Sequence, residues 1–257
     1  MLSILYEDNH LLVIDKPAGI ATMGAESGPT VHSLAADYLK RKYNKPGKAF
    51  VGIVSRLDTM TSGVLVLART SKAASRLTPQ FGGPVAGKKS PPERAEKLYI
   101  AAVQGRLAED HATWVDQVYK DDTARRMRVG SPKNSRSPGV DSQRAELSYR
   151  TMGRTDAATI VAVRLATGRK HQIRVQFADR GHAVWGDRKY RSTEPFADGI
   201  ALHSCLLRIT HPTLQTRLTF STPVPPTWKM FRDALPPPEQ LCQSMLESFD
   251  LRSDDAL

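Results

Sequence analysis

An arginine and an aspartate two residues apart form the pattern in this sequence that best suits chemistry. Arg56 and Asp58 project to the same side of the backbone if it is extended, and the segment 59–63, rich in Thr, Ser and Gly, follows them. A carboxylate in such an open setting can act as a covalent nucleophile or stabilise developing positive charge. An ion pair or a turn-capping aspartate explains the same residues more simply. The pattern alone therefore leaves both a structural and a catalytic role open.

A second group of polar side chains lies at an expected strand-to-helix junction, in the segment 167–174. Its cations and donors are Arg169, Lys170, His171 and Arg174. Helix N-termini attract anions, and basic side chains add to that attraction. His171 and Arg174 are three residues apart, hence on one helical face. An exposed polar helix start, with Arg174 as an ordinary surface residue, is the alternative.

A tyrosine at the start of an apolar run, Tyr99 in Lys97-Leu98-Tyr99, is the third candidate. Taken alone, this position is better explained by a core tyrosine whose hydroxyl is satisfied. Only its combination with the two preceding groups makes a functional role worth testing.

The elements that must position these residues are mostly strands. Apolar, β-branched runs bounded by Gly and Pro predict strands, and a run that alternates polar and apolar residues, 216–220, predicts a half-buried one. Helical spacing of apolar residues predicts helices over 30–39, with Thr30 as N-cap, and over 171–180, with Gly181 as the stop. Strands do not alternate regularly with helices, which favours an α+β fold with a mixed, largely antiparallel sheet and flanking helices. The predicted apolar strands are 11–14, 64–67, 98–103, 159–163 and 202–209.

Two segments, 81–96 and 121–144, are rich in Gly, Pro and basic residues and predict surface loops. The second is either a solvated insertion or a basic flap that follows a nucleic-acid backbone. We expect the tail from Pro236, with its three prolines, to be a frayed appendage, which gives a domain over 1–235 and a tail over 236–257. The basic residues of the second segment are Arg125, Arg126, Arg128, Lys133, Arg136 and Arg144.

The composition of the 257-residue chain favours an anionic partner. Lys and Arg outnumber Asp and Glu by 37 to 26, a net charge of +11. Nucleic acid is the commonest such partner, although basic surfaces also serve solubility alone. Cys205 and Cys242 are the only cysteines, too few for a zinc site or a disulfide framework. Without a signal peptide or a long apolar segment, we expect a cytoplasmic protein that does not enter a membrane.

In combination and in order, these motifs resemble the RluA family of RNA pseudouridine synthases. The family signature H-R-L-D-x-x-T-S-G is matched from Arg56 to Gly63, and the resemblance spans residues 6–228. Two positions depart from it: Ser55 stands where the family usually has His, and Gln176 where His often follows Arg-Val. Further matching motifs are Asp15-Lys16-Pro17-Ala18-Gly19, Lys97-Leu98-Tyr99, Gly168 to Arg174, Gly181-His182, Gly186-Asp187, Ala201-Leu202-His203 and His211-Pro212.

The resemblance implies a pseudouridine synthase catalytic fold with a central cleft and chemistry without metal or cofactor. Asp58 would be the essential carboxylate, acting on C1′, on C6 or through a glycal. Arg174 would pair with Asp58, and Tyr99 would stack on the target base. Arg56, with Arg169, Lys170 and His171, would bind the RNA, whose target uridine flips out of its stack.

Two other functions compete with this hypothesis. A catalytically idle RNA-binding or ribosome-assembly protein would need no carboxylate, and a hydrolase acting on sugars would need a second one, for which Asp187 is the notable candidate. The resemblance leaves ribosomal and transfer RNA open as substrates. Because there is no room for an N-terminal S4-like domain, we expect a short stem-loop as the substrate. A monomer is the default expectation for the oligomeric state.

Overall fold

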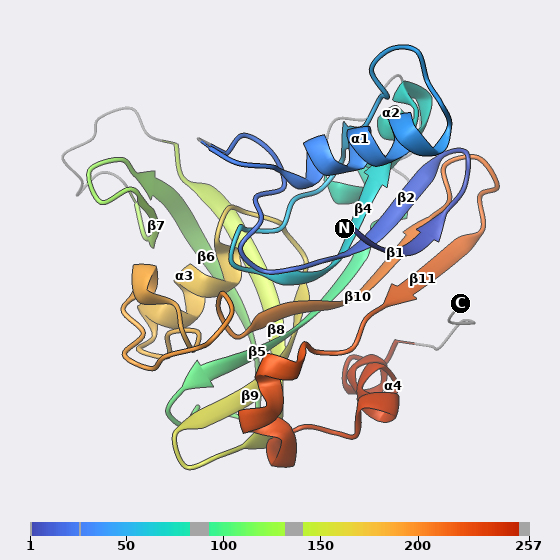
Figure 1. Cartoon of the computed structure of the whole chain (residues 1–257). Coiled ribbons are helices and arrows are strands. Elements are labelled where there is room, and N and C mark those ends of the chain that lie inside the picture. Colours follow the sequence, from blue (N-terminus) through green and yellow to red (C-terminus); the bar gives the residue numbers. More distant parts are fainter. Residues whose placement is uncertain (1, 26, 83–92, 132–140, 252–257) are drawn as a thin grey trace. The chain divides into compact units, whose positions relative to one another are not determined.

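The computed structural model describes residues 2–25, 27–82, 93–131 and 141–251, which form two compact units (Figure 1). Unit 1 is built from residues 2–97 and 204–222, and unit 2 from residues 98–203 and 223–251. In the described part of the chain, no helix is long and apolar enough to cross a membrane.

Unit 1 contains strands in the order β1-β2-β4-β10, with β3 paired to β4 and β11 paired to β10. The pairs β1–β2, β2–β4, β3–β4 and β10–β11 are antiparallel. In β2 the four apolar residues Leu11 to Ile14 are all fully buried, so both faces of this strand are covered, which explains its continuous apolar sequence. The strands are β1 (Ser3–Glu7), β2 (Leu11–Lys16), β3 (Gly52–Ile53), β4 (Ser62–Ala68), β10 (Leu202–Thr210) and β11 (Arg217–Ser221).

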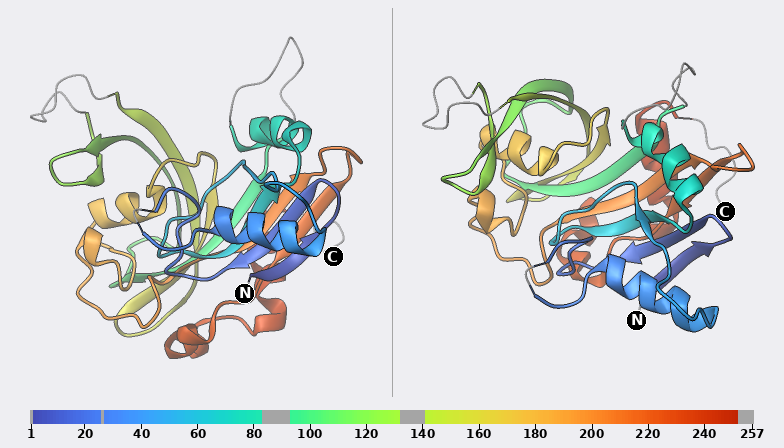
Figure 2. Two further views of the ribbon diagram at one scale, coloured as in Figure 1. Left: turned by 45° about the horizontal axis from the view of Figure 1, so that its top comes forward. Right: turned by 90° about the horizontal axis from the view of Figure 1, so that it is seen from above.

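Two helices and a 3-10 segment accompany these strands: α1 (Val31–Lys42), α2 (Ser71–Leu77) and η1 (Thr78–Phe81). Thr30 and Ser33 form a reciprocal capping box at the start of α1, which satisfies two of the amide groups that a helix N-terminus leaves exposed. From α2, Ala73 and Leu77 join a core cluster with one face of β2, β4 and β10. The right-hand view of Figure 2 shows α1 on the other side of these strands.

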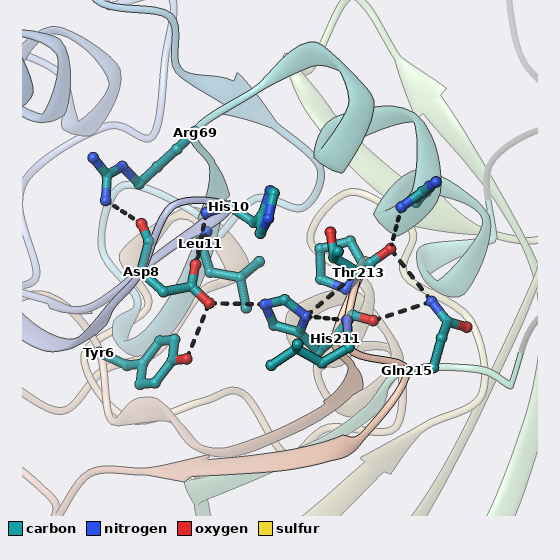
Figure 3. A network of polar contacts seen from close by, with 11 residues as sticks. Tyr6, Asp8, His10, Leu11, Arg69, His211, Thr213 and Gln215 are labelled. Carbon is teal, nitrogen blue, oxygen red and sulfur yellow. Dashed lines mark hydrogen bonds and ion pairs between the residues drawn. The ribbon is translucent and has the colours of Figure 1, made fainter.

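A polar network ties the β1–β2 turn to the β10–β11 turn within unit 1 (Figure 3). His211 Nδ1 accepts the amide N–H of Leu214 at 2.8 Å, so its Nε2 carries the proton that is donated to Asp8 Oδ2, also at 2.8 Å. Burial raises the pKa of Asp8, but hydrogen bonds from the amides of His10 and Leu11 and from His211 outweigh it and leave the pKa below its usual value. The network therefore holds these two turns of unit 1 together.

Unit 2 contains strands in the order β5-β9-β8-β6-β7, and every neighbouring pair is antiparallel. Helix α3 and the 3-10 segment η3 pack on this sheet through Val175 and Tyr190, which meet Val118, Met127 and Ala145. The elements are β5 (Glu96–Gln104), β6 (His111–Asp121), β7 (Arg126–Val129), β8 (Gln143–Arg154), β9 (Ala158–Leu165), α3 (Gln172–Asp179), η3 (Arg188–Tyr190), η4 (Pro226–Ala234) and α4 (Pro238–Ser248).

The predicted α+β class with a largely antiparallel sheet is confirmed, as are the six predicted strands and both predicted helices. Two predictions are wrong in part. The segment 121–144 is not a continuous loop, because Arg126–Val129 pairs with β6 as β7. The tail is not a frayed appendage, because Pro238–Ser248 forms α4 and buries Leu241, Met245 and Leu246.

Some of the predictions fall on residues that the structure does not describe. Lys133 and Arg136 of the second basic segment lie outside the described residues, as does most of the first, 83–92. The domain boundary at residue 235 stays a prediction.

Candidate active site

In unit 1, Asp58 lies in the connection between β3 and β4. The amide N–H of Thr61 donates to the Asp58 carbonyl at 3.1 Å and closes a turn. The side chain of Asp58 is half-buried, whereas that of Arg56 is exposed. Asp58 therefore lies in a turn between two strands, with its carboxylate half-buried.

The backbone on both sides of Asp58 is fixed by hydrogen bonds from residues 19–22. The Thr22 hydroxyl donates to the Leu57 carbonyl at 2.8 Å and accepts the Leu57 amide at 3.2 Å. The amide of Gly19 donates to the Thr59 carbonyl at 2.8 Å. Because Leu57 and Thr59 flank Asp58, these bonds restrict the position of its carboxylate.

A buried lysine, Lys16 at the end of β2, completes this support. Its ammonium group donates to the carbonyls of Pro17 and Ile20 at 2.8 Å and to that of Thr59 at 3.2 Å. Burial lowers the pKa of Lys16 to about 8, and the nearby carboxylates of Asp58 and Asp15 oppose the decrease. The sequence located Lys16 only in a turn motif. Its position next to a Pro-Ala-Gly turn could have indicated this role, since the carbonyl groups of a buried turn need hydrogen-bond donors.

The start of β4 packs tightly on β10. Gly63 has a φ of +114°, and a Cβ there would lie 2.3 Å from the Ser204 carbonyl oxygen. Only glycine fits, because other residues would suffer both the strained backbone and the overlap. The glycine that follows Asp58 is therefore required by packing.

In unit 2, Arg174 lies on α3 and makes a bidentate ion pair with Asp187. Its Nε and Nη2 lie 2.6 and 2.9 Å from the two carboxylate oxygens, and both side chains are about 95% buried or more. The guanidinium also stacks over the Tyr190 ring, 5.1 Å from its centroid. Arg174 is thus no surface residue, and it is held by Asp187, the residue before η3.

Tyr190 connects the predicted RNA-binding cluster to the sheet. Its hydroxyl lies 2.9 Å from His171 Nδ1 and accepts the Met127 amide at 3.0 Å. His171, the residue before α3, has a left-handed φ of 54°. The two residues do not share a helical face as predicted, because His171 precedes α3, but both contact the Tyr190 side chain.

The loop that carries Arg169 and Lys170 is held by Gln172. The Gln172 side-chain oxygen accepts from the Thr167 hydroxyl at 2.7 Å and from the Arg169 amide at 3.0 Å. Its amide nitrogen donates to the Glu146 carbonyl at 3.0 Å. Arg169 and Lys170 themselves are exposed, which suits contacts with an anionic ligand. The sequence did not reveal this role of Gln172, although polar side chains near helix starts often form hydrogen bonds with nearby backbone groups.

Comparison with known proteins decides the family. A family model described as RNA pseudouridylate synthase matches residues 10–179. The chain belongs to this family. Its members are isomerases that act on RNA, and the predicted family and reaction class are confirmed.

Similar sequences cover most of the chain. A protein of Xylella fastidiosa named ribosomal large subunit pseudouridine synthase D is 31% identical over the whole chain and 71% of its own length. RNA pseudouridine synthase YjbO of Bacillus subtilis, which is uncharacterized, is 32% identical over 87% of the chain and 73% of its own length. The chain spans 62% of the length of a Nitrosomonas europaea protein with the same name as the Xylella protein, at 32% identity.

Similarity to a solved structure supports the fold of this family member. Human RNA pseudouridylate synthase domain containing 1 matches with a TM-score of 0.67 and 24% identity, over 95% of this chain and 94% of its own.

Two further residues of this pseudouridylate synthase family member bear on the site. Tyr99 on β5 is largely buried, with 8% of its surface exposed. Gln176, at the position where relatives often have His, is fully buried and donates to Asp116 at 2.7 Å, while its Oε1 has no hydrogen-bond partner within the described part of the chain. Gln176, the position at which this chain departs from its relatives, thus lies inside unit 2, and its side chain links α3 to β6.

Proposed function

We propose that this chain converts a uridine of large-subunit ribosomal RNA to pseudouridine, with Asp58 as the essential carboxylate. The observation that carries the proposal is the fixed turn at Asp58, whose two neighbours are both hydrogen-bonded to residues 16–22. Fixing a carboxylate before substrate arrives lowers the entropy that must be lost to reach a reactive geometry. The names of the Xylella and Nitrosomonas relatives support ribosomal RNA as the substrate.

The reaction is an isomerisation within one nucleotide. The bond from C1′ to N1 of the base breaks, a bond from C1′ to C5 forms, C5 loses its proton and N1 gains one. No oxidant, reductant or transferred group is needed, so the proposal includes no metal or cofactor. Asp58 attacks C1′ or C6, or acts through a glycal, and its negative charge stabilises positive charge that develops on the ribose.

The other residues have supporting roles in the proposal. Arg174 pairs with the Asp58 carboxylate, since opposite charges at short range attract each other. Tyr99 stacks on the flipped base, and Arg56 holds the nucleotide or fills the space it vacates. Arg169, Lys170 and His171 contact the flanking RNA, with phosphates as the targets of the two cations. A single copy of the chain in the cytoplasm suffices for this chemistry.

The test is a map of pseudouridines in total cellular RNA by carbodiimide-based sequencing. A deletion strain is complemented with wild-type protein, with Asp58→Asn, or with Asp156→Asn as a control at an exposed aspartate between β8 and β9. We expect one or a few sites in large-subunit ribosomal RNA to vanish in the deletion strain. Wild type and Asp156→Asn should restore them, and Asp58→Asn should not.

Other outcomes would be equally informative. If sites vanish only from transfer RNA, transfer RNA is the substrate in place of ribosomal RNA. If Asp58→Asn restores the sites at equal expression, Asp58 is not the essential carboxylate. If no site changes in the deletion strain, the chain binds RNA without modifying it.

A further inference from the structure

A basic surface lies at the C-terminal end of α1, outside the motifs discussed above. It consists of Lys40, Arg41 and Lys45, all exposed. Residues 38–57 contain six cations and no carboxylate, so the only charged residues between this surface and Asp58 are basic. With Asp37 and Asn44, the three cations line a surface hollow of about 440 Å³.

Helix stabilisation accounts for only part of this charge. Cations near a helix C-terminus interact favourably with its exposed carbonyls. Here, however, the Lys45 amide donates to the Lys40 carbonyl at 3.0 Å and the Asn44 amide to the Arg41 carbonyl at 3.3 Å. Asn44 has a φ of 46°, so the helix ends in a Schellman motif that already satisfies these carbonyls. Lys45 also lies beyond the helix.

In the part of the chain that the structure describes, the three cations are also not used in ion pairs. Within residues 2–25, 27–82, 93–131 and 141–251, no carboxylate oxygen lies within 4.0 Å of the side-chain nitrogens of Lys40, Arg41 or Lys45. Asp37, the acid in the hollow, leaves a net charge of +2 among the lining residues. The surface therefore retains charge for an external anion.

Neighbouring contacts fix this end of the helix. Glu7 of β1 accepts hydrogen bonds from Tyr38 at 2.8 Å, Lys42 at 2.8 Å and Tyr43 at 2.7 Å. Arg69 stacks on the Tyr43 ring at 4.5 Å. Because Lys42 is committed to Glu7, it is excluded from the surface. A surface held in this way loses little freedom when a ligand binds.

The opposite end of α1 is tied to the support of Asp58. The Val31 amide donates to the Ala21 carbonyl at 2.9 Å, and the next residue, Thr22, holds Leu57. Twelve helical residues span about 18 Å, so the basic surface lies roughly that far along the helix from the Asp58 support. Figure 1 shows α1 running between these two ends.

We propose that Lys40, Arg41 and Lys45 bind backbone phosphates of the RNA substrate outside the target nucleotide. The inference rests on the proposed function, which supplies RNA as the anionic partner. Contacts with phosphates position an RNA without reading its sequence, and they offset the few kcal/mol needed to flip a base from its stack. The surface thus adds affinity and leaves the chemical step unchanged.

The test compares the triple variant Lys40→Gln/Arg41→Gln/Lys45→Gln with a matched control of equal net charge, Arg106→Gln/Lys229→Gln/Arg232→Gln. The control neutralises three exposed cations of unit 2, and Gln keeps the helix propensity of Lys and Arg. Binding of in vitro transcribed large-subunit ribosomal RNA is measured between about 50 and 200 mM salt. Pseudouridine formation is measured in the same RNA.

For the triple variant, we expect the slope of log affinity against log salt to become shallower by about 2, since each phosphate contact contributes roughly 0.7 to 0.9. Its maximal rate at saturating RNA and its unfolding temperature should match wild type. Lys40→Arg/Lys45→Arg should keep the wild-type slope. An unchanged slope, or an equal change in the control, would overturn the proposal. If wild type itself forms no pseudouridine in this RNA, the proposed function fails first, and the inference with it.

Discussion

The buried ion pair between Arg174 and Asp187 allows the structural contribution of one residue to be separated from its catalytic one. Removing one partner of a buried pair leaves the other charge unpaired and costs about 3–5 kcal/mol. Replacing both by apolar residues of similar size is often neutral. We therefore expect Asp187→Leu and Arg174→Met each to lower the free energy of unfolding by about 3 kcal/mol, and the double variant to regain most of it.

Activity should not follow stability in that series. If Arg174 acts on the Asp58 carboxylate as proposed, the double variant folds but forms pseudouridine at least about 100-fold more slowly, the scale of one lost charge-stabilising group. Urea unfolding and single-turnover pseudouridine formation measure the two quantities. A stable double variant with wild-type rates would assign Arg174 a structural role only.

The pKa of Lys16 predicts a pH dependence of stability. Its value in the folded protein, about 8, lies below the ordinary lysine value near 10.4. Between these two pH values the unfolded chain binds the proton and the folded chain does not, so the free energy of unfolding rises with pH, by at most about 1.4 kcal/mol per unit from this group. Burial and Arg94 also lower the pKa of Lys97 to about 8, which acts in the same direction.

Comparison with variants isolates this effect from other titrating groups. Urea unfolding of wild type, Lys16→Met and Lys97→Met between pH 7.5 and 9.5, a window chosen to span the folded pKa of about 8, should show a smaller rise for each variant. Equal slopes in all three proteins would contradict burial of an ionisable amine at either position. Lys48→Met, at an exposed lysine of unit 1, should match wild type.

Motifs located the candidate residues, but not their partners. Asp58, Tyr99 and Arg174 were found because their spacing in the sequence is distinctive. Lys16 and Asp187 were not assigned their roles, because each bonds to a residue outside its own motif: Lys16 to the Thr59 carbonyl at 3.2 Å, and Asp187 to Arg174. Such pairings depend on the register of strands and turns, which residue types alone do not determine.

At the scale of elements, the strongly apolar runs were predicted, whereas some strands with many exposed residues were not. The strands β2, β4, β5, β9 and β10 consist mostly of buried residues, and most of these are apolar. Strand β6 instead alternates exposed and half-buried residues over most of its length, with Trp, His and Asp among them, so its signal was weak.

Helix α4 was missed although its sequence carries a helix signal. Pro238 is at its first position, where proline is favoured, and Leu241, Met245 and Leu246 follow at helical spacing. The run of three prolines that ends at Pro238 was interpreted instead as the start of a frayed appendage.

The buried face of α4 predicts that the tail stabilises the protein. Met245 is fully buried, and truncating a buried Met to Ala costs about 2–5 kcal/mol. We expect Met245→Ala to lower the free energy of unfolding by that amount in urea denaturation. Gln243→Ala, at an exposed position of the same helix, should stay within about 0.5 kcal/mol of wild type. Equal stabilities would support the predicted domain boundary at residue 235.

At the scale of the whole molecule, the net charge of +11 has consequences that no single residue carries. Binding to RNA releases counterions from its phosphates, so affinity falls linearly with salt on logarithmic axes. A surplus of cations also accelerates the encounter with a polyanion. The catalytic step itself takes place around one nucleotide and involves few screened charges.

The two stages should therefore respond differently to salt. We expect kcat/KM for an RNA substrate to fall with a slope of about 0.9 or less per phosphate contact, while kcat at saturating RNA changes little. Steady-state rates over a range of KCl concentrations measure both, with unfolding temperatures at each concentration as the control for folding. A parallel fall of kcat would mean that salt acts on the Asp58 site itself or on release of the product. A flat kcat/KM would mean that the surplus charge lies away from the RNA, and that the basic surface at α1 contributes nothing to binding.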